Sequence, residues 1–149
     1  MAGFGNTYKK GLTDYVFRLT AFQGGTSTTS AFFVSLHTGD PGPDGQTANE
    51  VTTVSTGYAR VSVTLTAGAG FAAATTANPS VTSNSGTITF PTAVTTNWGT
   101  VTYFGIWTSS TLTTAAAFVG GQILTASQVV NIGNTASFAV GALTHSFTG

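Results

Sequence analysis

Three carboxylates around a glycine-rich turn are the residues of this sequence whose type and spacing best suit metal chemistry. Asp40 and Asp44 share a short segment with glycines and prolines, and Glu50 follows it. Carboxylate oxygens are the ligands that hard cations such as Ca²⁺ prefer. An EF-hand loop would place acidic ligands where this chain has Gly42 and Val51, so the pattern departs from that motif. We therefore expect a turn whose Asp side chains accept backbone N–H groups, with Ca²⁺ binding as the alternative.

The two histidines, His37 and His145, are the other candidate metal ligands or bases. The chain has no Cys, and no Asp or Glu follows position 60, so a complete set of metal ligands is not expected. No serine lies in the Gly-x-Ser-x-Gly context of an activated nucleophile. We expect His37 to hydrogen-bond into the adjoining turn, and Glu50 to form a structural salt bridge with Arg60 across a hairpin.

A glycan hydrolase is the enzymatic alternative, and it would require two carboxylates about 5–10 Å apart. The available carboxylates lie on an expected helix or within one turn region: Asp14, Asp40, Asp44 and Glu50. This distribution predicts that the protein is not an enzyme, and no motif calls for a cofactor.

Charge is confined to one part of the chain. The four basic and four acidic residues all lie within the first 60 positions, and residues 61–149 carry none. Nucleic-acid binding and attachment to anionic membranes both require clustered Lys and Arg, so neither partner is expected. The longest apolar run, residues 31–36, is too short to cross a bilayer, and no signal peptide is apparent. A weakly charged surface favours association, so we expect an assembly component.

The N-terminal segment has the periodicity of an amphipathic helix. Apolar residues recur at spacings of three and four: Phe4, Tyr8, Leu12, Tyr15, Leu19 and Phe22. Lys10, Asp14 and Arg18 follow one another at i,i+4 and predict a solvent-exposed face. The glycines at 24 and 25 end the pattern. We expect a helical arm over residues 1–25 whose stripe, from Tyr8 to Phe22, is an interface with its own domain or with a neighbouring subunit.

Residues 26–149 have β-strand patterns and predict one domain. Strict alternation of apolar residues marks residues 31–37 and 60–66 as strands. Shorter candidate strands are residues 87–90, 100–107, 117–124, 128–132, 135–140 and 143–147, and turn clusters occupy residues 39–45, 68–70, 78–86 and 109–114. The predicted fold is mainly β: an antiparallel β-sandwich or jelly roll with an N-terminal α-helix.

Four aromatics lie close together around the expected strand at residues 100–107. Phe104 and Trp107 are expected in the core, whereas Tyr103 points to the opposite side by strict alternation. Trp98 precedes a glycine and is expected at the corner where the strand begins. Aromatics at a rim serve as interface anchors or as sugar-stacking platforms.

Six motifs, in order along the chain, resemble a group of small tailed-phage proteins. They are Phe33-Val-Ser-Leu-His-Thr-Gly-Asp-Pro-Gly, Asn49-Glu-Val, Gly57-Tyr-Ala-Arg-Val, Ile88-Thr-Phe-Pro, Trp98-Gly-Thr-Val-Thr-Tyr-Phe-Gly-Ile-Trp and Gly120-Gly-Gln-Ile-Leu. The resemblance implies an N-terminal helix with a β-rich domain and a virion structural or tail-fibre-like protein. It implies structural roles, and no catalytic ones, for the matching positions His37, Asp40, Pro41, Glu50, Tyr58, Arg60, Pro91, Trp98 and Gly105.

The favoured functional hypothesis is a capsid decoration (cement) protein, assembled into the virion in the host cytoplasm. Its expected partners are the major capsid protein and further copies of itself, in a closed homo-oligomer such as a trimer. The alternative is a tail, collar or fibre-associated adaptor that touches the host surface. In that case a host glycan is the expected partner of the loops at residues 78–86 and 109–114.

Overall fold

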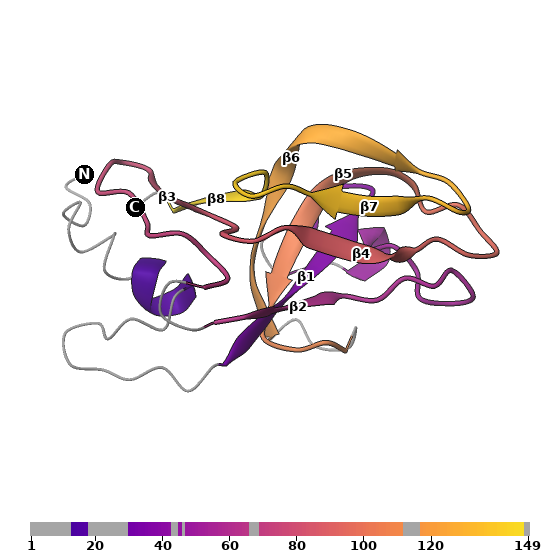
Figure 1. Cartoon of the computed structure of the whole chain (residues 1–149), viewed down its shortest axis with the longest axis horizontal. Helices are drawn as coiled ribbons and strands as arrows, with labels where there is room; N and C mark the ends of the chain where they lie inside the picture. The colour runs from indigo at the N-terminus through magenta and orange to yellow at the C-terminus, as the bar shows by residue number, and fades with distance from the viewer. Residues whose placement is uncertain are drawn as a thin grey trace.

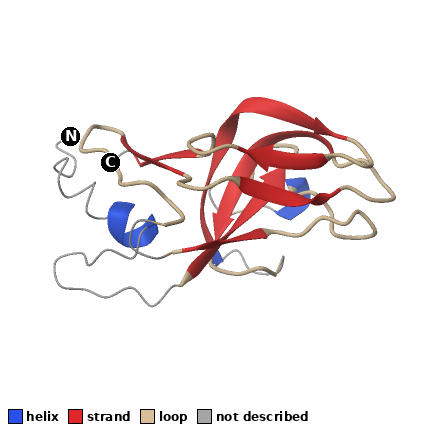
Figure 2. Cartoon of the chain, viewed as in Figure 1, coloured by secondary structure: helices blue, strands red, loops and turns tan. Residues whose placement is uncertain are grey.

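Antiparallel β-strands make up most of the computed structural model, which describes residues 13–17, 30–42, 45, 47–65, 69–111 and 117–147 (Figures 1 and 2). Residues 13–17 form a helical turn. The other elements are β1 (Ala31–His37), the 3₁₀ turn η1 (Thr47–Asn49), β2 (Val61–Thr64), β3 (Ser80–Ser83), β4 (Ile88–Thr92), β5 (Gly99–Trp107), β6 (Phe118–Val130), β7 (Thr135–Phe138) and β8 (Thr144–Phe147). The mainly β prediction is confirmed.

The strands form three sheets in which every pair is antiparallel. The large sheet has the order β2-β1-β5-β6, and the two smaller sheets are β3-β8 and β4-β7. In Figure 1 the β4-β7 pair crosses in front of the large sheet. The sheets do not join into a closed barrel within the described residues. The antiparallel architecture is therefore confirmed, but a jelly roll or sandwich is not.

One face of the large sheet carries the main hydrophobic core. Strand β1 buries Phe32, Val34 and Leu36, the residues whose alternation marked it as a strand, with 3% or less of each exposed. Across the sheet, Val34 pairs with Ile106. The β4-β7 pair closes the core with Phe90 and Phe138, whose rings meet edge to face at 6.1 Å. Burying such side chains is the main contribution to the stability of a domain of this size.

Strand β6 corrects the expectation of two separate strands at residues 117–124 and 128–132. Val101 of β5 pairs with Gln128, but Tyr103 pairs with Ile123. Four β6 residues, Leu124–Ser127, therefore lie opposite Thr102 alone, which makes this a special bulge, larger than the common two-against-one type. Alternation breaks at a bulge, which is why the sequence pattern indicated two strands.

The segment 78–86 was expected to be a turn, and this expectation was wrong because the segment contains β3. The strand pairs with β8 and buries the hydroxyl residues Ser80 and Thr82. Just after it, the fully buried Asn84 donates its amide to the carbonyl oxygen of Ala139 at 2.8 Å and accepts from the N–H of Leu143 at 2.8 Å. Polar residues of this kind are typical of turns in sequence, so the strand could not be predicted from composition.

The helical turn at residues 13–17 packs on the β domain of its own chain. Phe17 is 4% exposed and contacts the rings of Phe32, Phe71 and His145 at centroid distances of 5.5, 5.1 and 5.1 Å. Asp14 is 7% exposed, and its carboxylate accepts the N–H of Ala74 at 2.7 Å. The prediction of a solvent-exposed face through Asp14 was therefore wrong. No described helix is long and apolar enough to cross a membrane.

The buried face of this helical turn differs from the predicted stripe. Thr13, Asp14 and Phe17 are buried, whereas Tyr15 of the stripe is half-buried. The other stripe residues fall outside the described residues: Tyr8, Leu12, Leu19 and Phe22. Two of the three buried residues are polar, so apolar periodicity could not mark this face. The interface role of the stripe stays a prediction.

Phe17→Ala is expected to lower the free energy of unfolding by about 3 kcal/mol, the low end of the range for truncating a buried phenylalanine, because it removes a ring packed between Phe32 and Phe71. Urea unfolding of the full chain would measure the change. Tyr15→Ala, two positions away and half-buried, is the matched control and should cost less. Equal effects of the two substitutions would contradict the packing of Phe17 described above.

Candidate functional site

A buried polar and aromatic cluster beside the end of β1 gathers four of the residues singled out in the sequence: His37, Glu50, Tyr58 and Arg60. Strand β1 ends at His37, which forms an isolated bridge with Glu50. Arg60 immediately precedes β2, the neighbour of β1. We call these four residues, with Ser35 and Trp107, the Arg60 cluster. Because β1 lies between β2 and β5 in the sheet, residues far apart in the sequence come into contact in this cluster.

Arg60 and Glu50 form a buried bidentate ion pair, as predicted. Arg60 Nε donates to Glu50 Oε1 at 2.8 Å, and its terminal NH2 group donates to Glu50 Oε2 at 2.7 Å. Each side chain is only 1% exposed. Two parallel charge-assisted hydrogen bonds fix both the distance and the plane of the two groups. Both carboxylate oxygens of Glu50 are therefore committed to the ion pair.

The other side of the Arg60 guanidinium anchors the turn after β5. Its Nη1 group donates to the carbonyl oxygens of Ser109 and Thr111, each at 3.0 Å. The guanidinium carbon lies 3.7 Å from the centroid of the Trp107 ring, a cation–π arrangement. Lysine could not replace this arginine, because an ammonium has no planar set of donors. Arg60 thus links β2, the end of β5 and the following turn.

Tyr58 connects the ion pair to the backbone of β1. Its hydroxyl donates to Glu50 Oε1 at 3.0 Å and accepts the N–H of Leu36 at 2.9 Å. Burial, followed by the negative charge of Glu50, raises the pKa of Tyr58 well above its ordinary value of 10.0. Tyr58 is therefore a neutral hydrogen-bonding bridge and cannot serve as a general base.

His37 is fully buried beside Ser35 and Trp107. The Trp107 Nε1–H group donates to Ser35 Oγ at 2.7 Å, and the same hydroxyl lies 2.7 Å from His37 Nε2. Ser35 Oγ already accepts one hydrogen bond, so its own O–H group is free to donate to His37 Nε2. That nitrogen must then be unprotonated, as in a neutral imidazole. Burial lowers the pKa of His37 from 6.5 to about 4, although the charge of Glu50 opposes this change. We expected His37 to bond into the adjoining turn; instead it bonds within its own strand.

Sequence reasoning missed Ser35, and it assigned Trp107 only to the core. Trp107 is indeed buried, with 0% exposed, but it lies with the Arg60 cluster. A Cβ atom at Gly105 would lie 2.6 Å from Ser35 Oγ and 2.8 Å from Trp107 Nε1, so only glycine fits there. The signal present in the sequence was a hydroxyl inside the apolar β1 pattern; its place opposite Gly105 follows from the strand register.

The segment that suggested calcium binding contains a turn of the predicted kind. Asp40 Oδ1 accepts the N–H of Gly42 at 2.8 Å. Glu50 is bound to Arg60, as described above, and Asp44 lies outside the described residues. In the part of the chain that the structure describes, no three His, Asp or Glu side chains come together as a possible metal site.

Trp98 lies at the start of β5, as predicted. It is 5% exposed, and its Nε1–H group donates to the carbonyl oxygen of Thr56 at 3.0 Å. Its ring meets that of Tyr58 edge to face at 5.3 Å. Trp98 therefore ties the loop before Tyr58 to the beginning of β5 and is not available for surface stacking.

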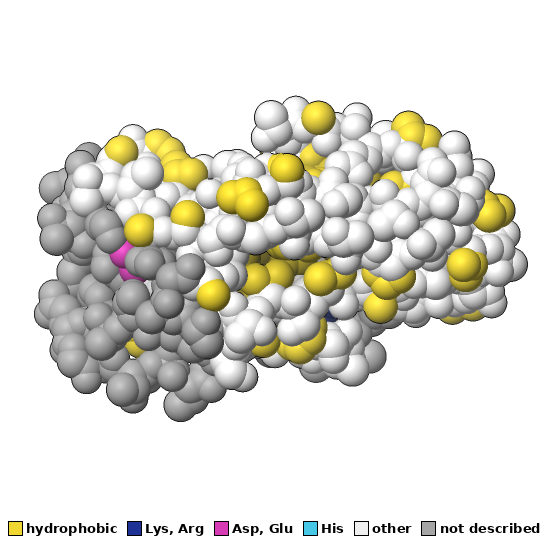
Figure 3. All heavy atoms as spheres, viewed as in Figure 1, with side chains coloured by type: hydrophobic (Ala, Val, Ile, Leu, Met, Phe, Trp, Pro, Cys, Tyr) yellow, Lys and Arg dark blue, Asp and Glu magenta, His cyan; other side chains and the backbone are white. Residues whose placement is uncertain are grey.

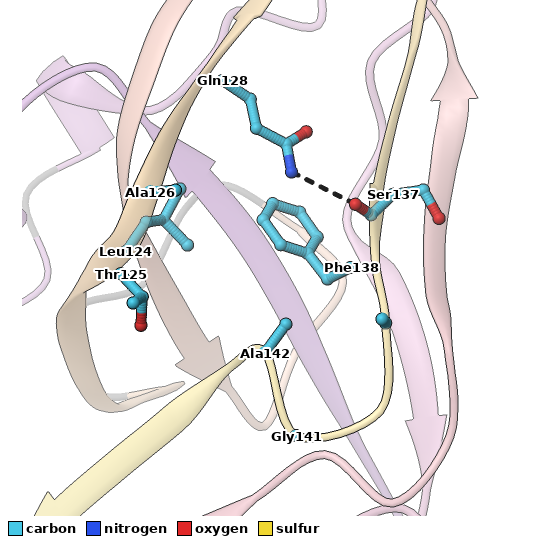
Figure 4. Close-up of a pocket in the computed structure, with 9 residues that line it drawn as sticks. Leu124, Thr125, Ala126, Gln128, Ser137, Phe138, Gly141 and Ala142 are labelled. Atoms are coloured by element: carbon cyan, nitrogen blue, oxygen red, sulfur yellow. Dashed lines mark hydrogen bonds between the residues drawn. The ribbon is translucent and has the colours of Figure 1, made fainter.

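A groove of about 290 Å³ lies between β6 and β7 (Figure 4). Its upper end in the figure is bridged by Gln128, whose amide donates to the carbonyl oxygen of Ser137 at 3.1 Å. Phe138 points into the space from β7, and the bulge of β6 forms the opposite wall. All the lining residues are uncharged. The groove has no acid, base or nucleophile that is set up for catalysis.

Comparison with known proteins relates the chain to a family of bacteriophage proteins. No curated protein matches it. A family model described as "Podophage GP4 fiber I protein gp80" matches residues 3–146, almost the entire chain. This agrees with the tailed-phage resemblance drawn from the six sequence motifs. The chain belongs to this family of podophage fibre proteins, which are structural components of the virion.

Proposed function

We propose that this protein is a fibre-associated subunit of a podophage tail, serving as an adaptor or as a contact with the host surface. The observation that carries the proposal is the match of the podophage fibre family to residues 3–146. The match covers β1 to β7 and all but the last residue of β8, so it concerns the β domain itself.

The described polar groups support a structural role. Glu50 is bound by Arg60 and Tyr58, Asp14 accepts a backbone N–H group, and Asp40 caps a turn. These carboxylates therefore hold the fold together, and we propose that the protein is not an enzyme. Binding would come from neutral surface contacts repeated over several copies, because repetition converts modest contacts into avidity.

Capsid decoration, which we favoured from the sequence, is the second candidate location. Its motivation was the weakly charged, Thr-rich β domain, the N-terminal helix and the family resemblance. A weakly charged surface suits association with a capsid or with a fibre equally well. The family match supports the fibre location better. We therefore propose the fibre location, with contact to the major capsid protein as the alternative.

Quantitative mass spectrometry of purified particles would test the location by counting this chain relative to the major capsid protein. A fibre-associated subunit should be present at a few to a few dozen copies per particle. A ratio near one, or a simple lattice fraction such as one third, would contradict the fibre proposal and establish a capsid role. Immunogold labelling of intact particles would provide an independent check.

A further inference from the structure

Three loops that are far apart in the sequence meet at one end of the molecule. They comprise residues 52–57, 93–98 and 131–134, and we call them the loop tip. In Figure 1 they form the right-hand end, away from the helical turn and from the β3-β8 sheet. Hydrogen bonds of 2.9 to 3.0 Å connect them: Val94 N to Thr56 O, Trp98 Nε1 to Thr56 O, Ala93 N to Asn134 O and Ile132 N to Asn97 Oδ1. The loop tip is therefore one connected surface.

Each loop exposes one branched aliphatic side chain. Val54 is 74% exposed, Val94 is 48% exposed and Ile132 is 54% exposed. The other exposed residues of these loops are Thr, Ser, Asn and Gly. In Figure 3 this end shows yellow patches on a white background, without the colours of charged residues. Exposed apolar residues with a polar rim mark interaction sites where they lie together, and the hydrogen bonds above hold the three loops that carry these side chains at one end of the molecule.

Backbone strain accompanies two of these side chains. Ser55 directly follows Val54 and has a φ of 55°, and Thr95 directly follows Val94 and has a φ of 65°. The left-handed region is unfavourable for residues other than glycine, above all for a β-branched residue such as threonine. Strain of this kind persists only where surrounding contacts hold it, and it is concentrated at functional sites. The connected loops thus hold both valines in fixed, exposed positions.

The chemistry of the loop tip restricts its partner. Its loops carry no Lys, Arg, Asp or Glu, so an anionic surface polymer would find no counter-charge there. The indole of Trp98 is buried and bonded to Thr56, so no aromatic platform is available for a sugar. A centre of aliphatic residues with a neutral polar rim, and without charges, matches the core of a protein–protein contact. We propose that the loop tip binds an uncharged, apolar patch on a protein exposed at the host-cell surface.

This inference rests on the proposed fibre location, because a contact with the host cell requires the chain to lie on the outside of the particle. Three aliphatic side chains provide a small contact compared with the roughly 800 Å² per partner of a stable complex. One copy should therefore bind weakly, and several copies on one particle should bind together. For the same reason, a stable dimer of two loop tips is not expected.

The test uses phage particles that carry Val54→Asp together with Ile132→Asp. Each aspartate would need to be desolvated in the contact, so we expect the adsorption rate constant on host cells to fall by about tenfold or more. Val140→Asp is the matched control, because Val140 is equally exposed (63%) but lies outside the loop tip. It should leave adsorption unchanged. Mass spectrometry should find the same amount of the chain in all three kinds of particle.

Treatment of the cells identifies the class of partner. Adsorption that is lost after protease treatment of the cells, but kept after periodate oxidation of their glycans, supports the proposal. The reverse pattern would overturn it in favour of a glycan. Unchanged adsorption of the double variant would also overturn the proposal. If the purified double variant instead lost self-association that the wild-type chain shows, the partner would be a second copy of the chain, and the proposal would be overturned as well. A copy number typical of a capsid protein would instead refute the fibre location itself.

Discussion

Arg60→Ala is expected to lower the free energy of unfolding by about 3–5 kcal/mol, the range for removing one partner of a buried ion pair. The substitution leaves the Glu50 carboxylate buried without its positive partner, and it also removes the donor to the carbonyl oxygens of Ser109 and Thr111. Both losses are costly because buried polar groups without partners retain their full desolvation penalty. This is the largest effect that we expect from a single substitution outside the apolar core.

Urea unfolding would measure this change, and two further variants separate its causes. Glu50→Gln combined with Arg60→Met removes both charges, so it should cost clearly less than the sum of the single substitutions. Arg60→Lys keeps the charge but loses the bidentate geometry, so it should be intermediate. Because the guanidinium lies 3.7 Å from the Trp107 ring centroid, the tryptophan emission of the folded variants should also change. An Arg60→Ala variant within about 1 kcal/mol of the wild type, a loss typical of exposed pairs, would contradict the buried ion pair.

The stability of the protein is expected to fall as the pH decreases from about 6.5 to about 4, by roughly 3 kcal/mol for His37 alone. The pKa of His37 is lowered from 6.5 to about 4 in the folded chain, mainly by burial. Between these values the unfolded chain binds a proton that the folded chain does not, so acid favours unfolding. Above pH 6.5 both states are neutral, and below pH 4 both are protonated. The loss is therefore confined to this window.

Urea unfolding at several pH values between 4 and 7.5 would measure the effect, and His37→Gln should remove most of it. Burial also lowers the pKa of His145, so a smaller dependence with the same sign should remain in that variant. If His37→Gln does not fold, NMR titration of the wild-type imidazoles gives the answer directly. A His37 pKa near 6.5 would contradict the prediction. Asp40, Glu50 and Arg60 are the charged residues that act on His37, and their effects on its pKa partly oppose one another.

Local patterns predicted several features correctly. The alternation in residues 31–37 places three apolar side chains on one face, and this face became the core side of β1. The Glu50–Arg60 ion pair could be predicted because the two residues bracket a turn and are two of the few charged residues of the chain. The position of Trp98 at a strand entry followed from the adjacent glycine. Each of these predictions depends on residues that are close together in the sequence, or on the small number of charged residues that could pair.

Other features depend on contacts between distant segments. The sequence could not show that Ser35 lies between His37 and Trp107, because this requires the register of β1 against β5. It suggested a turn where β3 pairs with β8, because buried hydroxyl residues resemble turn residues until their partners are known. The face of the helical turn was also misassigned, since Thr13 and Asp14 are buried through hydrogen bonds to remote residues.

The sequence by itself determined the class of this protein: a mainly β, weakly charged structural protein of a tailed phage. These properties follow from composition, periodicity and motifs, which are local or additive along the chain. Only the tertiary structure decided which residues form the Arg60 cluster and which loops form the loop tip. The reason is physical: strand pairing brings together residues separated by tens of positions, and burial then determines which polar groups must find partners.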